Sequence, residues 1–422
     1  MVCLMKTYII LVINILPLAI LLIFGNSFAN VQPLIDEAFE SNRDISMAEL
    51  DELFKTAEID IQSALPDPVF MTEFRGMPID PIDPAETNEW MYMVQQMFPF
   101  PGKLGRKKEI GALQLDRQIW QTRAVQLALR ARVKKIYYNL AFTQKALDMN
   151  DQIINLLQQV LQVSEAKYRV GSASQGDVYR AQIEIARLEA ERVELQRFFD
   201  TRVAALNRVI GRSLDTPPPV FEMPDSLFTM NRTVASLDTL LIQNNPMLKS
   251  AFMNLRQKDK ELSLARLTRY PDVTVMGGYM AMNDMPDRLM GRLSVTLPFM
   301  PWSRKDSKAQ IQKASAAKSK QEIAYTDLLE KLRYKVIETV NSIQSIQTRY
   351  EIFGKTIIPV QNLSIKVSIA DYKTGTVDFL TVLTNIRELF DDQLKAERLK
   401  ADYYQKLSEL ETYSAVEFND HF

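Results

Sequence analysis

The stretch Tyr168-Arg169-Val170-Gly171-Ser172 returns in similar form as Tyr372-Lys373-Thr374-Gly375-Thr376. The second stretch lies 204 residues after the first, because 372 − 168 = 204. The apolar positions that follow the two stretches recur at the same offset. This period is far too long for a solenoid, whose repeats run roughly 20–50 residues. The chain is therefore predicted to contain two copies of one structural unit.

Each copy is predicted to contain a helix, two short strands, a long helix, a tight turn at the glycine and a returning helix. The first set of elements is expected at 31–65, 69–75, 89–100, 103–168 and 177–210. The second set is expected at 234–267, 272–282, 289–299, 305–372 (with a kink at Pro359) and from the Gly375 turn to about Tyr413. Pro217-Pro218-Pro219 marks the seam. We therefore predict two repeats, 30–215 and 216–422, with hairpin tips near 171 and 375.

The final helix carries apolar or aromatic residues at alternating spacings of four and three. The spaced positions are Val382, Ile386, Leu389, Gln393, Ala396, Lys400, Tyr403, Leu407 and Leu410. Such a seam is typical of helices that pack side by side. Long antiparallel helical hairpins are therefore expected, although a plain cytosolic coiled coil would carry the same seam.

Composition excludes several classes of protein. The 422 residues have a formal net charge of −1, which does not favour nucleic acid as a partner. The single cysteine, Cys3, and the single histidine, His421, lie at the two ends. A disulfide framework, a zinc site and Cys/His or Ser/His catalysis lack their residues. We expect no catalytic residues, no cofactor, no resident metal and no enzymatic activity.

The amino-terminal segment is predicted to be a secretory signal. Lys6 precedes the apolar run Tyr8–Phe24, and small residues then stand where a signal peptidase reads. Residues 1–29 are therefore expected to be removed by cleavage after Ala29. An uncleaved inner-membrane anchor is the alternative, because the apolar run is long for a signal.

The strand pairs point towards a membrane. In 289–299 apolar or neutral residues alternate with residues that include Arg292, Ser294 and Thr296. Transmembrane barrel strands alternate in this way, and so do strands of soluble sandwiches. Four strands cannot close a barrel, and an open edge in lipid leaves backbone groups unpaired. If the strands enter a membrane, several copies of the chain must pool them.

Both strand pairs end in proline and aromatic residues immediately before a long helix. Proline stops strand pairing and redirects the chain. Phe100, Phe299 and Trp302 are then expected at the membrane–water boundary, where aromatic rings are favoured. A strand-to-helix corner in a soluble protein is the alternative interpretation.

With these features the chain resembles the TolC family of outer-membrane efflux proteins. The resemblance rests on the two-fold repeat, the two tip stretches and Phe98-Pro-Phe-Pro-Gly-Lys-Leu-Gly-Arg before a helix. That last stretch is most similar to the CzcC-like heavy-metal branch. The resemblance implies a mainly helical fold with a membrane β-barrel contribution, in which three copies form one tube. Each copy would give four strands and long coiled-coil helices.

The resemblance also implies partners and a function. A homotrimer in the outer membrane would be the passive exit duct of a tripartite efflux system, with its helical barrel in the periplasm. It would receive substrates from a periplasmic adaptor and an inner-membrane pump, with the resistance-nodulation-division type expected. Heavy-metal cations and drugs are the candidate cargoes. The alternatives are a channel for type I protein secretion and an inner-membrane-anchored periplasmic coiled-coil scaffold.

The resemblance further assigns adaptor docking to the two tips. The matching positions are Val170, Gly171, Ser172, Thr374, Gly375 and Thr376. Glycine permits the left-handed backbone of an ordinary turn, so a turn without docking explains both glycines equally well. Asp177 matches an acidic periplasmic gate position, and it is equally suited to cap the returning helix.

Methionines cluster around both strand pairs. Those around the first pair are Met71, Met77, Met91, Met93 and Met97, and those around the second are Met276, Met280, Met282, Met285, Met290 and Met300. Thioethers are soft ligands for monovalent copper or silver. Methionine also fills irregular apolar gaps and can face lipid. We favour the second interpretation at the level of sequence.

Overall fold

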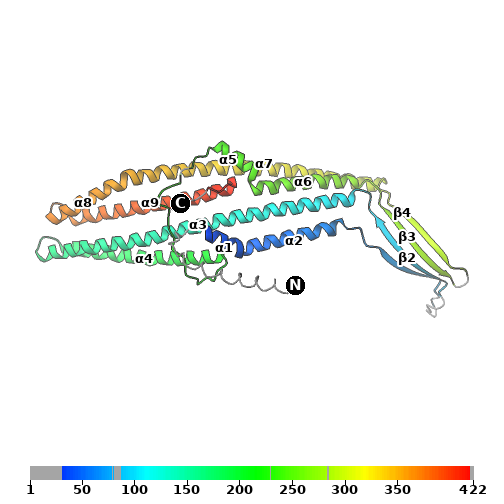
Figure 1. The fold of residues 1–422 in the computed structure, drawn as a ribbon, viewed down its shortest axis with the longest axis horizontal. Coiled ribbons are helices and arrows are strands. Elements are labelled where there is room, and N and C mark those ends of the chain that lie inside the picture. The colour runs from blue at the N-terminus through cyan, green and yellow to red at the C-terminus, as the bar shows by residue number, and fades with distance from the viewer. Residues whose placement is uncertain (1–30, 78, 80–86, 229, 283–284, 419–422) are drawn as a thin grey trace, which may run out of the picture.

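The computed structural model describes residues 31–77, 79, 87–228, 230–282 and 285–418. The molecule is long and thin, with its strands at one end and two helical hairpin tips at the other (Figure 1). The predicted signal segment, residues 1–29, lies outside the described residues.

The two halves of the chain repeat one order of elements. The first half contains α1 (Gln32–Ser41), α2 (Arg43–Ser63), β1 (Val69–Arg75), β2 (Glu89–Phe98), α3 (Lys103–Arg169) and α4 (Gln175–Val209). The second contains α5 (Val234–Asn244), α6 (Pro246–Leu267), β3 (Val273–Met282), β4 (Arg288–Val295), α7 (Pro301–Ile352), the π-helical η2 (Phe353–Ile357), α8 (Ile358–Thr374) and α9 (Phe379–Ser414). The predicted duplicated, mainly helical fold is confirmed.

The long helices form where the sequence lacks helix breakers. No proline occurs within α3, which has 67 residues and is therefore about 100 Å long. The second long helix, predicted as one element over 305–372, is interrupted by η2 just before Pro359. Proline lacks the N–H that would continue the helical ladder, and π-helical turns commonly accompany such breaks. The irregularity predicted at Pro359 is thus present, as a π-helical turn.

Two helices that were predicted as continuous are each broken at a buried asparagine. Asn42 separates α1 from α2, and Asn245 separates α5 from α6. Each has an extended backbone and caps the following helix, accepting the N–H of Asp44 at 2.8 Å or of Leu248 at 3.1 Å. Helix N-caps favour asparagine for this reason. The predictions of single helices over 31–65 and 234–267 were therefore wrong.

The same two asparagines tie each helix pair to the returning helix of its half. Asn42 Nδ2 donates to the Val209 carbonyl at 2.8 Å, and Asn245 Nδ2 donates to the Tyr413 carbonyl at 2.9 Å. The two acceptors lie 204 residues apart, because 413 − 209 = 204. The sequence repeat is therefore also a repeat of buried hydrogen bonds.

The four strands form one antiparallel sheet in the order β1-β2-β3-β4. β1 and β4 are its two edges, and neither has a second partner strand among the described residues. β2 and β4 end at Phe98 and Val295, earlier than the predicted Phe100 and Phe299. Pro99 and Pro298 follow, and proline cannot donate to a strand ladder.

The pairing register sorts the side chains onto two faces, because successive residues of a strand point to opposite sides. One side, the apolar face, carries Phe70, Phe74, Trp90, Tyr92, Val94, Val275, Tyr279, Leu289, Leu293 and Val295. The other side, the methionine face, carries Met71, Met91, Met93, Met97, Met276, Met280, Met282 and Met290. The alternation predicted for 289–299 is confirmed within β4. The strand methionines therefore lie on the side opposite the aromatic and branched aliphatic residues.

The predicted seam of α9 is buried against α3, α7 and α8. Tyr403 and Tyr404 are fully buried in it, and their hydroxyls donate to the backbone carbonyls of Phe228 and Ser226. These bonds fasten the segment between α4 and α5 onto α9. None of the described helices combines the length and apolarity that crossing a membrane requires.

Candidate functional site at the hairpin tips

The first hairpin tip joins α3 to α4 at Gly171. Ser172 N–H donates to the Lys167 carbonyl at 2.8 Å, and Gly171 N–H donates to the Tyr168 carbonyl at 2.9 Å. This pair of bonds closes a helix and requires a left-handed residue. Gly171 has φ of 74°, and an added Cβ would meet no atom within 4 Å. Backbone conformation, and not crowding, therefore requires glycine.

The second tip, between α8 and α9, has the same construction. Thr376 N–H donates to the Asp371 carbonyl at 2.9 Å, and Gly375 N–H donates to the Tyr372 carbonyl at 3.2 Å. Gly375 has φ of 88°, with open space around it. The hydroxyls of Thr374 and Thr376 are 3.0 Å apart. The two predicted docking stretches are therefore equivalent turns at the same end of the molecule (Figure 1).

At each tip an acidic residue helps to cap the returning helix. Ser174 is the N-cap of α4, and Asp177 completes a capping box by accepting the Ser174 N–H at 3.4 Å. Asp177 is thus the third residue of the helix and not its cap. Asp378 holds the corresponding cap of α9. Hydrogen bonds from the Thr381 hydroxyl and N–H hold the pKa of the Asp378 carboxyl below its usual range.

The two tips are joined through Tyr372. Its hydroxyl lies 3.0 Å from Ser164 Oγ on α3. Lys167 Nζ donates to the Tyr372 carbonyl and lies 4.5 Å from the centre of its ring. Burial raises the pKa of the Tyr372 hydroxyl. The hairpins of the two halves are therefore held side by side at the tips.

The two tips differ in the exposure of the repeated tyrosine. Tyr372 is 5% exposed, whereas Tyr168 is 45% exposed and borders a small hollow with Tyr179. Val170, in the turn itself, is 77% exposed. The first tip thus presents apolar and aromatic surface to a partner. Sequence reasoning missed Tyr179 and the two roles of the repeated tyrosine, because the partners of Tyr372 come from a distant helix.

The predicted boundary aromatics lie at the opposite end of the helices. The Phe100 ring stacks on Tyr270, with centroids 4.5 Å apart, and its N–H donates to Asp272 Oδ1 at 2.7 Å. Phe299 and Trp302 are exposed at the start of α7. The structure therefore brings all three to the strand-to-helix corners, but it holds only Phe100 by a stacked ring.

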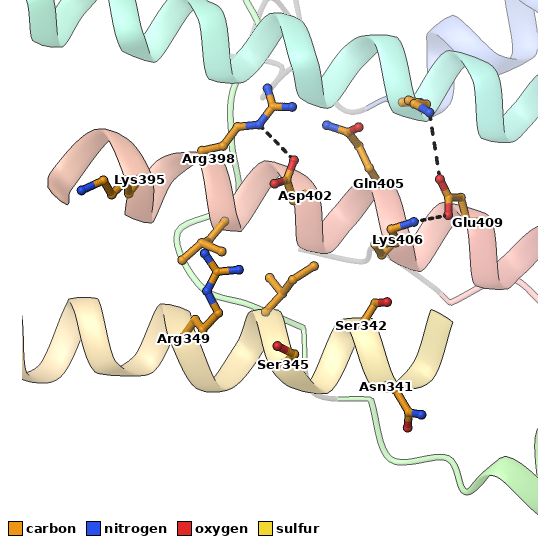
Figure 2. Close-up of a pocket in the computed structure, with 13 residues that line it drawn as sticks. Asn341, Ser342, Ser345, Arg349, Lys395, Arg398, Asp402, Gln405, Lys406 and Glu409 are labelled. Carbon is orange, nitrogen blue, oxygen red and sulfur yellow. Dashed lines mark hydrogen bonds and ion pairs between the residues drawn. The ribbon is translucent and has the colours of Figure 1, made fainter. Parts of the chain in front are cut away.

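A groove of roughly 750 Å³ lies between α7 and α9 (Figure 2). Its charged lining is mostly basic, with Asp402 and Glu409 as the acidic residues. Arg398 lies 3.0 Å from Asp402, and Lys406 lies 2.7 Å from Glu409. Among the described residues, no group of three or more His, Cys, Asp or Glu side chains is placed to hold a metal ion. The hairpin tips therefore remain the candidate functional site.

Comparisons with known proteins agree with this geometry. Residues 34–212 match the model of a family described as outer membrane efflux protein. A search of curated protein sequences finds no match.

Similar solved structures cover almost the whole chain. They include CusC, in a study of transmembrane channel formation, with 19% identity, a TM-score of 0.80 and 91% of each chain covered. They also include the outer-membrane channel OprN, with 15% identity, a TM-score of 0.78, and 91% of this chain and 89% of that one covered. A third is the outer membrane protein VceC from Vibrio cholerae, with 18% identity, a TM-score of 0.76, and 92% and 97% covered. Residues 34–212 thus match the outer membrane efflux protein family, and the chain as a whole has the fold of these channel proteins.

Proposed function

We propose that this protein is the outer-membrane exit duct of a tripartite efflux system. It conducts substrates passively from a periplasmic adaptor and an inner-membrane pump, of the resistance-nodulation-division type, to the exterior. The family match and the shared fold support this function. The observation that carries it is a body with two specialised ends, an open sheet and a pair of exposed helical turns. A duct makes and breaks no bond, so no catalytic residue is required.

The open sheet supports a ring of identical copies. In a bilayer, unpaired strand edges leave backbone groups without partners, so β1 and β4 must find neighbours. The charged side chains of the β1 edge, Glu73 and Arg75, pair with each other at 2.8 Å. Three copies with four strands each give a wall of twelve strands (3 × 4).

A stripe on α2 supports the same assembly. Met47, Leu50, Phe54 and Ile61 are all exposed and lie on one side of the helix, three, four and seven residues apart. An uncovered apolar stripe of this kind is typical of a protein–protein contact. In a ring of copies, the neighbouring copy would cover this stripe.

The internal repeat predicts one contact between copies. Within a chain, Ser164 of the first half meets Tyr372 of the second. Moving each residue to the other half by 204 gives Ser368 (164 + 204) and Tyr168 (372 − 204). If the halves alternate around a ring, Ser368 of one copy meets Tyr168 of the next. The exposure of Tyr168 in the single chain supports this contact.

Cysteine crosslinking tests the ring. The chain's single cysteine, Cys3, lies in the predicted signal, so after cleavage only the introduced cysteines can react. In outer-membrane fractions, a short bismaleimide should link Y168C/S368C chains into a ladder that ends at three. The control pair S164C/Y372C should link within one chain and give no ladder. If the protein is recovered with the inner membrane, or if Y168C/S368C gives only single chains, the result contradicts the proposed duct.

We also propose that the tip residues Val170, Gly171, Ser172, Thr374, Gly375 and Thr376 meet the adaptor, and that Asp177 lies at the periplasmic entrance. The exposure of Val170 supports docking, and a charge can be placed there without disturbing the core. V170D should make cells as susceptible to exported toxic compounds as a gene deletion, at unchanged protein levels. V193D is the control, because Val193 is similarly exposed, at 70%, but lies on α4 away from the turn. Equal efflux by the two variants would refute docking at this turn.

We further propose repeat boundaries at 30–215 and 216–422. The matched asparagine bonds in the two halves support this division, because each bond closes within its own repeat.

A further inference from the structure

The methionine face of the sheet is chemically distinct from the apolar face. All eight methionines of the four strands lie on it, and the apolar face of these strands has none. The apolar face uses leucine, valine and aromatic residues, whereas the methionine face has Val69 as its only branched aliphatic residue. Apolar filling alone does not produce such a separation, because leucine and methionine are nearly interchangeable in volume. The separation therefore points to the sulfur atom.

The methionine face is also the sheltered side of the sheet. Met91 is 1% exposed, and Met93 and Met276 are likewise buried. Leu289, on the apolar face, is 89% exposed. The three buried methionines form the centre of one cluster, and the partly buried members that pack against them are Met71, Met280 and Met290. Thioether groups from all four strands thus gather on one protected surface.

The centre of this surface is a row without charge. Met71 of β1 pairs with Met93 of β2, Met93 pairs with Gly278 of β3, and Gly278 pairs with Met290 of β4. A Cβ on Gly278 would lie 2.7 Å from Met93 Cγ, so the Met93 side chain occupies the space that glycine leaves. The Met93 side chain therefore reaches across Gly278 towards Met290, with Met71 on its other side. The charged residues of this face all lie in other rows, and they are Glu73, Arg75, Glu89, Arg288 and Arg292.

We propose that this row binds a soft monovalent metal cation, Cu(I) or Ag(I), through the sulfur atoms of Met93 and Met290, with Met71 beside Met93. Uncharged thioethers favour these soft ions over hard divalent cations, and two such ligands suit their low coordination numbers. Met91 and Met276 flank the row and shield it from water. As a statement about cargo, the inference rests on the proposed function, because a site on the sheltered wall of a duct lies along the route of export.

Metal binding to the purified full-length protein tests the site. The probe is silver nitrate in chloride-free buffer, measured by equilibrium dialysis, since Ag(I) needs no reductant. Wild-type protein should retain at least one Ag(I) per chain, and M71L/M93L/M290L should lose it. Leucine keeps the apolar volume and removes the sulfur. The control M149L/M247L/M253L changes methionines of α3 and α6 and should bind as wild type does.

Four further outcomes separate the possible explanations. If M71L/M93L/M290L binds both an apolar fluorescent dye and Ag(I) as strongly as wild type does, the methionine face is a plain apolar surface and the proposal is overturned. X-ray absorption of the Cu(I)-loaded wild type should show sulfur atoms as neighbours of the metal. Nitrogen or oxygen neighbours alone would overturn the proposal, and this measurement does not depend on whether the variant folds. An outer-membrane trimer that binds no Ag(I) refutes the site and leaves the duct. Ag(I) binding by a protein recovered with the inner membrane refutes the duct and leaves the site.

Discussion

Replacing Asn245 tests whether the buried asparagines hold each half together. Asn245 is 0% exposed and makes two kinds of bond at once. Its Oδ1 accepts the Leu248 N–H at 3.1 Å, which caps α6. Its Nδ2 donates to the Tyr413 carbonyl at 2.9 Å, which fastens the end of α9. Alanine removes both bonds and leaves the two backbone groups without these partners.

The expected loss follows from the two bonds. A lost N-cap costs about 1 kcal/mol. A lost buried hydrogen bond costs about 1 kcal/mol more. N245A should therefore lower the free energy of local opening by about 2 kcal/mol, and the amides at the end of α9 should exchange roughly 30-fold faster. N245S retains a capping oxygen and loses only the bond to the Tyr413 carbonyl, so about 1 kcal/mol and a roughly fivefold effect are expected there.

Hydrogen exchange followed by mass spectrometry measures this opening without reversible unfolding of the whole protein. N42A should have the matching effect at the end of α4, because Asn42 bonds to Val209 in the same way. Asn362, whose side chain donates to the Ile358 carbonyl in its own helix, supplies the control N362A, with less than a roughly threefold effect expected. If N245A changes exchange at the end of α9 no more than N362A does, the asparagines do not fasten the helix pairs and the reasoning is wrong.

Three further outcomes are expected. G375A should lower the melting temperature, because its φ of 88° costs an L-residue about 1–2 kcal/mol, whereas G105A inside α3 should raise it by removing a flexible glycine from open helix surface. E411Q should destabilise the protein by about 3–5 kcal/mol in thermal unfolding, because it removes the countercharge that lies 2.9 Å from the buried Lys134; a melting temperature equal to that of wild type would contradict this. Because hydrogen bonds depress the pKa of Asp378, its capping contribution is present above the ordinary carboxyl pKa and is lost as the pH falls through the lowered value. Exchange at the start of α9, corrected for intrinsic rates, should therefore rise in acid for wild type and stay flat for D378N.

Much of the fold could be predicted because its signals are local. The strands β1 and β3 begin and end within a residue of their predicted bounds, and α3 and α9 follow runs of helix-forming residues without proline. The two turn glycines were predictable from their place between helices, because few other residues adopt a left-handed backbone. The break at Asn245 also had a local signal, since Asn245 precedes Pro246, but a strong helical pattern on both sides concealed it.

The candidate site was only partly predictable. The positions of the tips were determined by the repeat, whereas the difference between Tyr168 and Tyr372 was not. Tyr372 is buried by Ser164 and Lys167, which lie more than 200 residues earlier in the chain. No local sequence pattern distinguishes a tyrosine that distant residues of its own chain bury from one that stays exposed.

The sequence by itself determined the duplicated order of elements, the length of the helices and the chemistry of the turns, because backbone preferences and hydrophobic periodicity act over a few residues. Only the tertiary structure decided that methionines from four strands share one sheltered face and that Asn42 and Asn245 reach the ends of the returning helices. Strand register and helix packing bring together residues far apart in the chain, and the free energy that selects those contacts belongs to the assembled fold.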